Sequence, residues 1–143
     1  MNRENCVFCE IVRGTAEASV VFEDDNVVAF LDINPVTDGH LLVVAREHAV
    51  TLDELEASTL VRMVLVARDL AHALRRSGIR CEGINLFYAD GEAAFQTVFH
   101  SHLHVIPRYQ DDGFRLDANV QFEKSRTALD FEAAQIRSAL EAD

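Results

Sequence analysis

Residues 96–108 read Gln96-Thr97-Val98-Phe99-His100-Ser101-His102-Leu103-His104-Val105-Ile106-Pro107-Arg108. Histidine recurs at every second position in the middle of this stretch, which is the period of a β-strand with two different faces. Side chains two residues apart in a strand point to the same face and lie about 6.6 Å apart along the chain. We therefore expect a strand over 98–107, with three imidazole rings on one face and Ser101, Leu103 and Val105 on the other.

Three histidines in one register are an unusual density, because each buried imidazole needs its own hydrogen-bond partner. A sheet face that merely carries satisfied histidines is the plainer interpretation, and it fits a lone histidine better than this run. Two chemical uses fit the run. One is a metal chelate of the His-x-His type, and the other is nucleophilic and acid–base chemistry by imidazoles that titrate near neutral pH. Spacing alone does not choose between them.

Two cysteines near the start of the chain bear on this choice. Cys6 and Cys9 are separated by two residues, a spacing that lets both thiolates bind one tetrahedral zinc ion. Such an ion needs two further ligands, for which His48 and His100 are the candidates. A site with four protein ligands has no open position and is structural. The alternative is that both cysteines are small buried apolar side chains on a short helix.

The bulk composition narrows the class of protein. The chain has 143 residues, which fits one domain over 1–143, and a formal net charge of −11, which disfavours nucleic-acid binding. Because the whole chain is negative, any anionic ligand must be held by hydrogen-bond donors at its own binding site. Apolar runs such as 41–45 are too short to cross a membrane, and Glu4 and Glu10 interrupt any signal-peptide pattern. Three cysteines, an odd number, disfavour a disulfide framework, so we expect a cytoplasmic protein.

Hydrophobic periodicity predicts the remaining elements. We expect a short helix over 6–13 that ends at Gly14, strands over 19–23, 26–32 and 40–45 with a turn at Asp24-Asp25, a strand over 84–88 and a final helix over 130–140. Thr51 and Glu54 have capping-box spacing, so the main helix is expected within 51–78, with room for a short turn before it. Strands that follow one another without intervening helices favour an α+β fold with an antiparallel sheet.

The histidine stretch, taken with two other segments, resembles a known family. These segments are Phe30-Leu31-Asp32-Ile33-Asn34-Pro35-Val36 and Gly39-His40-Leu41-Leu42-Val43-Val44. Together with the Cys-x-x-Cys pair they are similar to the zinc-bearing branch of the histidine triad (HIT) family of nucleotide hydrolases and transferases. The resemblance covers about residues 6–109, and the C-terminal extension 110–143 carries no motif of the family.

The resemblance implies a fold, an assembly and a catalytic residue. The family fold is a five-stranded antiparallel sheet with one long helix, here joined by a short N-terminal and a C-terminal helix, and the family is usually homodimeric. The nucleophile falls on His102, which would form a covalent nucleotidyl-histidine intermediate. His104 would bind the α-phosphate, His40 would support the same network, and Gln96 and Thr97 would contact the phosphate and the bridging oxygen.

By the same resemblance the base and ribose pocket falls on Phe8, Ile11, Phe30, Asp32, Ile33 and Asn34. Plain core packing is the alternative for the two phenylalanines and Ile11, and capping of the Asn34-Pro35 turn is the alternative for Asp32. The zinc ligands of the zinc-bearing branch fall on Cys6, Cys9, His48 and His100, the same four that spacing suggests.

The implied activity is cleavage of an α-phosphate bond in a purine nucleotide such as an adenosine phosphoramidate or a diadenosine polyphosphate. The tripeptide after the histidines, Ile106-Pro107-Arg108, slightly favours the dinucleotide-cleaving branch of the family. Two departures favour an alternative, a nucleotide-binding or regulatory module with little turnover: Ala89 stands where relatives carry a polar side chain, and Phe95 stands where they carry a small residue. A third possibility is a zinc hydrolase in which His100 and His102 hold an open metal.

Overall fold

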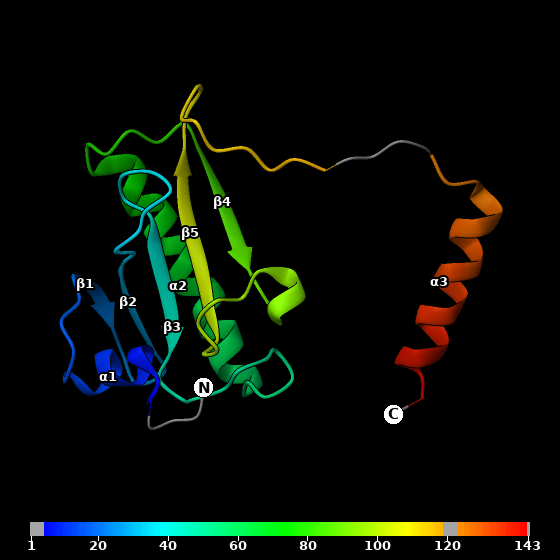
Figure 1. Cartoon of the computed structure of the whole chain (residues 1–143), viewed down its shortest axis with the longest axis horizontal. Coiled ribbons are helices and arrows are strands. Elements are labelled where there is room, and N and C mark those ends of the chain that lie inside the picture. Colours follow the sequence, from blue (N-terminus) through cyan, green and yellow to red (C-terminus); the bar gives the residue numbers. More distant parts are fainter. Residues whose placement is uncertain (1–4, 119–122, 143) are drawn as a thin grey trace.

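A computed structural model describes residues 5–118 and 123–142 of the chain. Five strands form one antiparallel sheet in the order β1-β2-β3-β5-β4 (Figure 1). Their bounds are β1 Val20–Glu23, β2 Val27–Leu31, β3 Leu41–Ala45, β4 Gly83–Tyr88 and β5 His102–Arg108. The helices are α1 Val7–Arg13, α2 Ala57–Arg76 and α3 Arg126–Leu140, and the 3-10 turn η2 spans Glu92–Ala94. The predicted α+β class and the five-stranded antiparallel sheet are confirmed.

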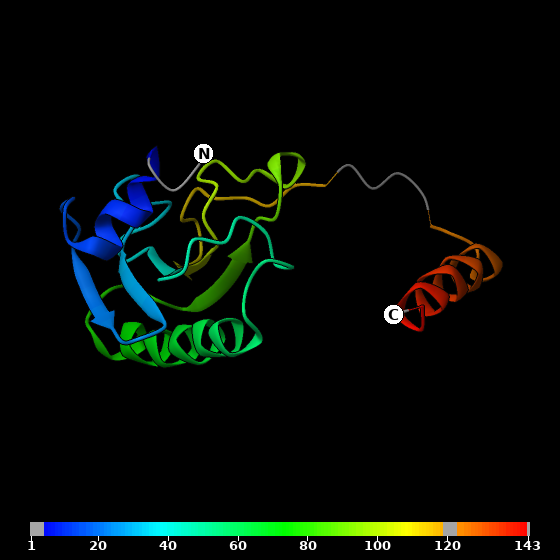
Figure 2. The same cartoon turned by 90° about the horizontal axis from the view of Figure 1, so that it is seen from below.

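The sheet lies between α2 on one face and the shorter α1 on the other (Figure 2). Alternate residues of each strand therefore enter two different cores. Val27 and Ala29 pack with Met63 and other α2 residues, whereas Val28 and Phe30 pack with the α1 side. Every residue of the central strand β3 is buried, because both faces of that strand are covered. His102 and His104 pair with Val44 and Leu42, which face α1, so these two histidines lie on the α1 face.

The predicted end of the first helix and the predicted hairpin turn are both present in the structure. α1 ends at Gly14, whose φ of 75° lies in the left-handed region, and its N–H bonds to the carbonyls of Glu10 and Ile11. The hairpin between β1 and β2 turns at Asp24, whose carboxylate accepts the N–H groups of Asn26 and Val27.

The predicted capping box at the start of the main helix is wrong. α2 begins at Ala57, with Glu56 at the N-cap position and no side-chain cap. Glu54 accepts the N–H of Val50, and Asp90 accepts the N–H of Leu52, so two N–H groups at the start of this segment are bonded to side chains. Residues 51–55 form a turn because these contacts outside the helix compete with helical hydrogen bonds.

The predicted extent of the histidine strand is also wrong. β5 begins at His102, four residues later than expected, so His100 lies in the loop before the strand. In that loop His100 N–H bonds to the Val98 carbonyl, and Ser101 N–H bonds to the carbonyl of Ala49. His100 is thus separated from the other two histidines and is available for a different role.

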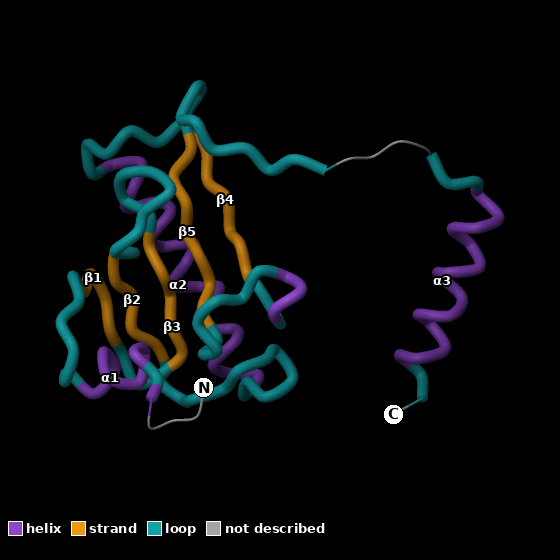
Figure 3. Tube along the Cα trace, in the orientation of Figure 1, coloured by secondary structure: helices purple, strands orange, loops and turns teal. Residues whose placement is uncertain are grey.

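α3 begins at Arg126, earlier than the predicted start at 130, because Ser125 caps it by accepting the N–H of Ala128. The helix stands apart from the sheet, and none of its residues is buried (Figure 3). Within the described residues, none of the helices has the length and hydropathy that a bilayer crossing requires.

Candidate active site and metal centre

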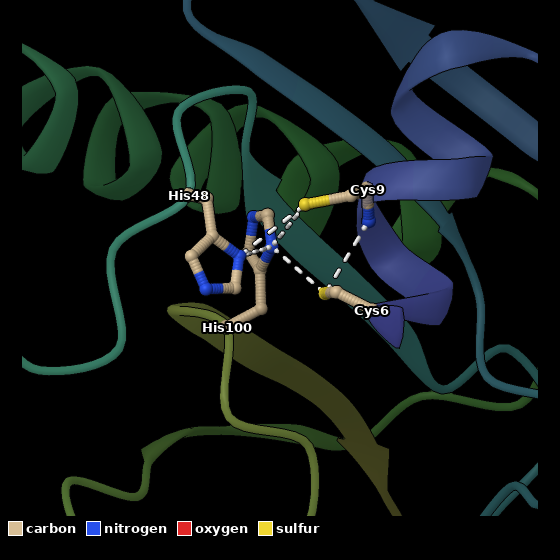
Figure 4. A group of neighbouring side chains, drawn as sticks. All are labelled: Cys6, Cys9, His48 and His100. Carbon is tan, nitrogen blue, oxygen red and sulfur yellow. Dashed lines mark hydrogen bonds between the residues drawn. The ribbon is translucent and has the colours of Figure 1, made fainter. Parts of the chain in front are cut away.

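Two cysteines and two histidines converge beside α1 (Figure 4). Cys6 is the N-cap of α1 and Cys9 lies in its first turn, whereas His48 follows β3 and His100 precedes β5. Nδ1 of His100 lies 3.3 Å from Sγ of Cys6 and 3.5 Å from Sγ of Cys9. Nδ1 of His48 lies 3.3 Å from Sγ of Cys9 and 3.3 Å from Nδ1 of His100. The structure thus brings together all four predicted ligands.

These separations match the edges of a zinc tetrahedron. With Zn–N bonds of about 2.0 Å and Zn–S bonds of about 2.3 Å, nitrogen–nitrogen edges are about 3.3 Å and nitrogen–sulfur edges about 3.5 Å. The donor set, two thiolates and two imidazoles, is also one that zinc prefers. The four residues therefore fit a zinc ion, and convergence of both imidazoles on the sulfurs is not expected of cysteines that serve only as buried apolar side chains.

A backbone carbonyl fixes the ring of His100 in the orientation that a metal needs. Nε2–H of His100 donates to the carbonyl oxygen of Ala45 at 2.6 Å, which leaves the lone pair on Nδ1, the nitrogen that faces the sulfurs. Among the described residues His102 belongs to neither group of side chains that could hold a metal ion. This arrangement disfavours an open zinc held by both His100 and His102.

His102, the first residue of β5, is buried and its protonation is set by the same loop. Its Nδ1–H donates to the carbonyl oxygen of His100 at 2.6 Å, so Nε2 carries the lone pair. The ring packs edge-on against Phe8, with the centroids 5.1 Å apart. A neutral imidazole with a fixed tautomer and an unprotonated Nε2 is a competent nucleophile toward phosphorus.

His40 and His104 form a second chain of hydrogen bonds on this face. The Val36 N–H can only donate, so Nδ1 of His40, 3.1 Å away, must accept and the proton lies on Nε2. Nε2–H of His40 then donates to Nδ1 of His104 at 2.8 Å. His104 must therefore carry its own proton on Nε2. The ring of His104 lies 4.9 Å from that of His102, which places an N–H donor beside the nucleophile.

Burial keeps all three of these rings uncharged at neutral pH. Removal from water lowers the pKa of His102, although the His100 carbonyl and Asp32 oppose this effect. The pKa of His104 falls to about 4, chiefly through burial and then through the neighbouring histidines. Burial likewise lowers the pKa of His40, against the opposing charge of Asp32, whose Oδ2 lies 3.6 Å from Nε2 of His40.

The residues expected to form the base and ribose pocket separate into two groups. Phe8 and Phe30 are buried in the α1-side core and contact each other edge to face at 5.6 Å, with Ile11 partly buried beside them. Ile33 is 91 % exposed, and Asn34 is also exposed. Asp32 caps the turn by accepting the Asn34 N–H, the alternative noted for it, while its second oxygen faces His40.

The side chain of Gln96 is fully used inside the protein. Its Oε1 accepts the N–H of Gly91, and its Nε2 donates to the carbonyls of Val50 and Val98. Gln96 is buried, and these bonds close the loop between β4 and β5. The next residue, Thr97, is exposed at the surface of that loop. Gln96 therefore shapes the loop that precedes the histidines.

The two departures from the family pattern occupy very different surroundings. Ala89 is buried, whereas the ring of Phe95 is 81 % exposed. Phe95 also has a φ of 69°, in the left-handed region that favours glycine. The loop thus keeps the backbone conformation of the small residue expected at this position, at a cost of order 1 kcal/mol.

Several contacts that orient the histidines are not predicted from the sequence. The Val36 N–H and the Ala45 carbonyl orient the histidines, yet both are backbone groups with no sequence signature. Tyr88 donates its hydroxyl to Ser101 at 2.8 Å, and Ser101 donates to the carbonyl of Thr51. The Ser101 side chain, between two functional histidines, is thereby fixed in the other layer of the protein.

The family model described as the HIT domain matches residues 13–111. A relative named adenylylsulfatase HINT3, from Arabidopsis thaliana, is 33 % identical over 138 residues, which are 96 % of this chain and 68 % of that protein.

Two solved structures are also similar. A protein from Streptococcus mutans UA159 superposes with a TM-score of 0.88 at 36 % identity, covering 98 % of this chain and 87 % of that one. A zinc-bound histidine triad family protein from Mycobacterium smegmatis has a TM-score of 0.74 at 40 % identity, covering 96 % of this chain and 99 % of that one.

The hydrogen bonds of Gln96 predict that replacing its side chain by one of the same shape, in Gln96→Glu, lowers the stability of the protein. In Gln96→Glu, oxygen replaces the nitrogen that donates to the carbonyls of Val50 and Val98, so a buried acid faces two acceptors. We expect the free energy of unfolding to fall by about 3 kcal/mol, measured by urea denaturation. Gln135→Glu, on the exposed surface of α3, is the matched control. A loss no larger than that of the control would show that these bonds do not stabilise the loop.

Proposed function

The chain belongs to the HIT domain family, and from this membership and the geometry around His102 we propose that it is a nucleotide hydrolase or transferase. It cleaves an α-phosphate bond of a nucleoside phosphoramidate or a dinucleoside polyphosphate through a covalent nucleotidyl-histidine intermediate. The observation that carries this proposal is the hydrogen bond from Nδ1–H of His102 to the carbonyl of His100, because it leaves the lone pair on Nε2.

The proposed reaction has two displacements. In the first, Nε2 of His102 attacks the α-phosphorus, and the electron pair of the broken bond leaves with the departing group, which takes a proton from solvent. In the second, water attacks the same phosphorus and loses a proton to solvent, and the electron pair of the P–N bond returns to Nε2. Nε2–H of His104 donates to a phosphate oxygen in both steps, and His40 keeps that proton in place by occupying Nδ1 of His104. This donor acts locally against the overall charge of −11.

The proposed partner is a purine nucleotide such as an adenosine phosphoramidate or a diadenosine polyphosphate. The base and ribose contact the pocket residues named from the resemblance, with Asp32 as the ribose-binding carboxylate and Ile33 as an exposed apolar contact. Gln96 acts by holding the loop that presents Thr97 to the phosphate. A relative whose name describes an adenylylsulfatase supports an adenosine-containing substrate.

We further propose that Cys6, Cys9, His48 and His100 hold a structural zinc ion. The match of their separations to a zinc tetrahedron supports this, as does the zinc-bound neighbour from Mycobacterium smegmatis. A zinc ion there ties α1 to the loop that positions His102. Zinc ligation requires reduced thiolates, which is in keeping with our expectation of a cytoplasmic protein.

The alternative, a binding module without turnover, rests on Ala89 and Phe95. Neither residue disturbs the hydrogen bonds of His40, His102 or His104, so we favour the enzyme. We also propose that the chain forms a homodimer, as the family does. The support for it is that β4 is an edge strand of the sheet, whose unpaired backbone groups can be covered by a second chain.

Trapping the intermediate tests the proposed reaction. Wild-type protein mixed with adenosine phosphoramidate or diadenosine tetraphosphate, quenched rapidly without acid and analysed by intact mass, should show a transient nucleotidyl adduct. His102→Ala should show neither adduct nor turnover, whereas His72→Ala, which changes an exposed histidine of α2, should show both. Turnover by His102→Ala would refute the mechanism. Binding without turnover in wild type would favour the binding module.

The lowered pKa of His102 predicts the acid limb of the pH profile. Protonation of Nε2 removes the nucleophilic lone pair, so activity falls as the pH drops through the pKa of this ring. Since burial holds that pKa below 6.5, the midpoint of the acid limb of kcat/KM should lie below pH 6.5. The ionisation of the substrate is measured separately. A midpoint at or above pH 6.5 would mean that burial does not lower the pKa of this ring.

Removal of one thiolate tests the zinc site. Wild-type protein should contain one zinc per chain by mass spectrometry under native conditions, and Cys6→Ser should lose it. We expect unfolding free energy to fall by about 3 kcal/mol, the stabilisation given by a ligand present at roughly a hundredfold excess over its dissociation constant. Cys81→Ser, outside the cluster, is the control. Unchanged stability after complete zinc loss would contradict a structural role.

A further inference from the structure

Ser101 is polar, whereas the other residues that alternate with the histidines, Leu103 and Val105, are apolar. Its side chain lies in the interior, with an exposed fraction of 0 %. A buried hydroxyl costs free energy unless it is hydrogen-bonded, so this serine needs partners that an apolar residue would not need. The proposed reaction does not use Ser101, although it lies directly before the proposed nucleophile.

Both backbone groups and the hydroxyl of Ser101 are hydrogen-bonded. Its N–H donates to the carbonyl of Ala49 at 2.7 Å, and its own carbonyl accepts the N–H of Ala45 at 3.3 Å. The hydroxyl donates to the carbonyl of Thr51 at 3.3 Å and accepts the hydroxyl of Tyr88 at 2.8 Å. Ser101 is therefore held by the end of β3, by the segment that follows β3 and by the end of β4.

The bond between Tyr88 and Ser101 has only one possible direction. The carbonyl of Thr51 can only accept, so it takes the single hydroxyl proton of Ser101, and Tyr88 must donate. Burial raises the pKa of Tyr88, so its hydroxyl keeps the proton that it donates. Tyr88 is the last residue of β4 and packs against the core on the α2 side of the sheet.

The placement of Ser101 controls the direction of the His100 carbonyl. The carbonyl of residue 100 and the N–H of residue 101 belong to one planar peptide unit, and in a trans peptide they point in opposite directions. The bond from Ser101 N–H to Ala49 fixes this plane on one side. On the other side the carbonyl accepts Nδ1–H of His102 at 2.6 Å. A shift of Ser101 would rotate the plane and move the acceptor that sets the tautomer of His102.

We propose that Tyr88 is a positioning residue for the nucleophile, which acts through Ser101 on the carbonyl of His100. Tyr88 packs on the α2 side of the sheet, whereas His102 lies on the α1 face, so its effect on the reaction passes through the chain. The inference rests on the proposed function and adds to it a hydroxyl outside the site on which the rate of the first displacement depends.

Removal of one hydroxyl tests the proposal. In Tyr88→Phe the ring stays and only the donor to Ser101 is lost. With adenosine phosphoramidate in a single turnover, we expect the maximal rate of adduct formation to fall about tenfold, while the substrate concentration at half-maximal rate changes less than about twofold. Tyr109→Phe is the matched control, because it removes the hydroxyl of the other tyrosine, whose ring contacts Arg80. The control should change neither quantity.

A second substitution tests whether Ser101 carries the effect. Ser101→Ala should lower the rate of adduct formation at least as much as Tyr88→Phe does. Tyr88→Phe added to Ser101→Ala should then lower the rate by less than about twofold more, because the bond between the two side chains is already absent. A further loss as large as that of Tyr88→Phe alone would overturn the route through Ser101.

A measurement without substrate separates this inference from the proposed function. In zinc-loaded protein with nitrogen-15-labelled histidine, the exchange of Nδ1–H of His102 with water reports how firmly the carbonyl of His100 holds it. Tyr88→Phe should speed this exchange about tenfold, and Tyr109→Phe should leave it unchanged. If wild type forms no adduct, the proposed hydrolase fails, and the exchange measurement still decides the role of Tyr88. Lower stability in urea with unchanged exchange would overturn the proposal.

Discussion

One short hydrogen bond connects the cluster of Cys6, Cys9, His48 and His100 to the proposed nucleophile. The carbonyl of His100 accepts Nδ1–H of His102 at 2.6 Å, while the ring of His100 points its Nδ1 at Cys6 and Cys9. His100 thereby contributes its ring to the cysteine and histidine cluster and its backbone carbonyl to His102. A zinc ion that held the ring in the cluster would therefore also help to hold the carbonyl against His102.

The rest of the site repeats this use of backbone groups. A peptide N–H or carbonyl does not titrate, so it imposes one tautomer on the imidazole that it contacts. The Val36 N–H does this for His40, and His40 passes the constraint to His104. Burial completes the arrangement, because it keeps the rings neutral and so preserves both the lone pair of His102 and the donor of His104. The proposed reaction therefore depends more on which nitrogen of each histidine ring carries the proton than on any charged side chain.

The sequence predicts the parts of the structure that depend on local signals. Gly14 ends α1, Asp24 makes the hairpin turn, and the spacing of Cys6 and Cys9 identifies two partners from distant segments, His48 and His100. Alternation in the histidine stretch predicts the strand but not where it begins. His100 leaves the strand because it bonds to the Ala45 carbonyl, a contact across 55 positions that no periodicity contains.

The predictions fail where a long-range contact competes with a local pattern. Thr51 and Glu54 have the spacing of a capping box, but the Leu52 N–H bonds to Asp90, 38 positions away, and the helix begins only at Ala57. The three backbone bonds of Gln96 are likewise not contained in any local pattern, and its expected place near the phosphate stays a prediction.

The tautomers of the histidines test the central claim most directly. Nitrogen-15 spectra of the zinc-loaded protein with labelled histidine, near neutral pH, distinguish protonated from unprotonated ring nitrogens, and single histidine substitutions assign the signals. We predict that His102 is neutral with its proton on Nδ1, and that His40 and His104 are neutral with theirs on Nε2. A proton on Nε2 of His102, or a cationic ring, would leave no lone pair for attack and would contradict the account.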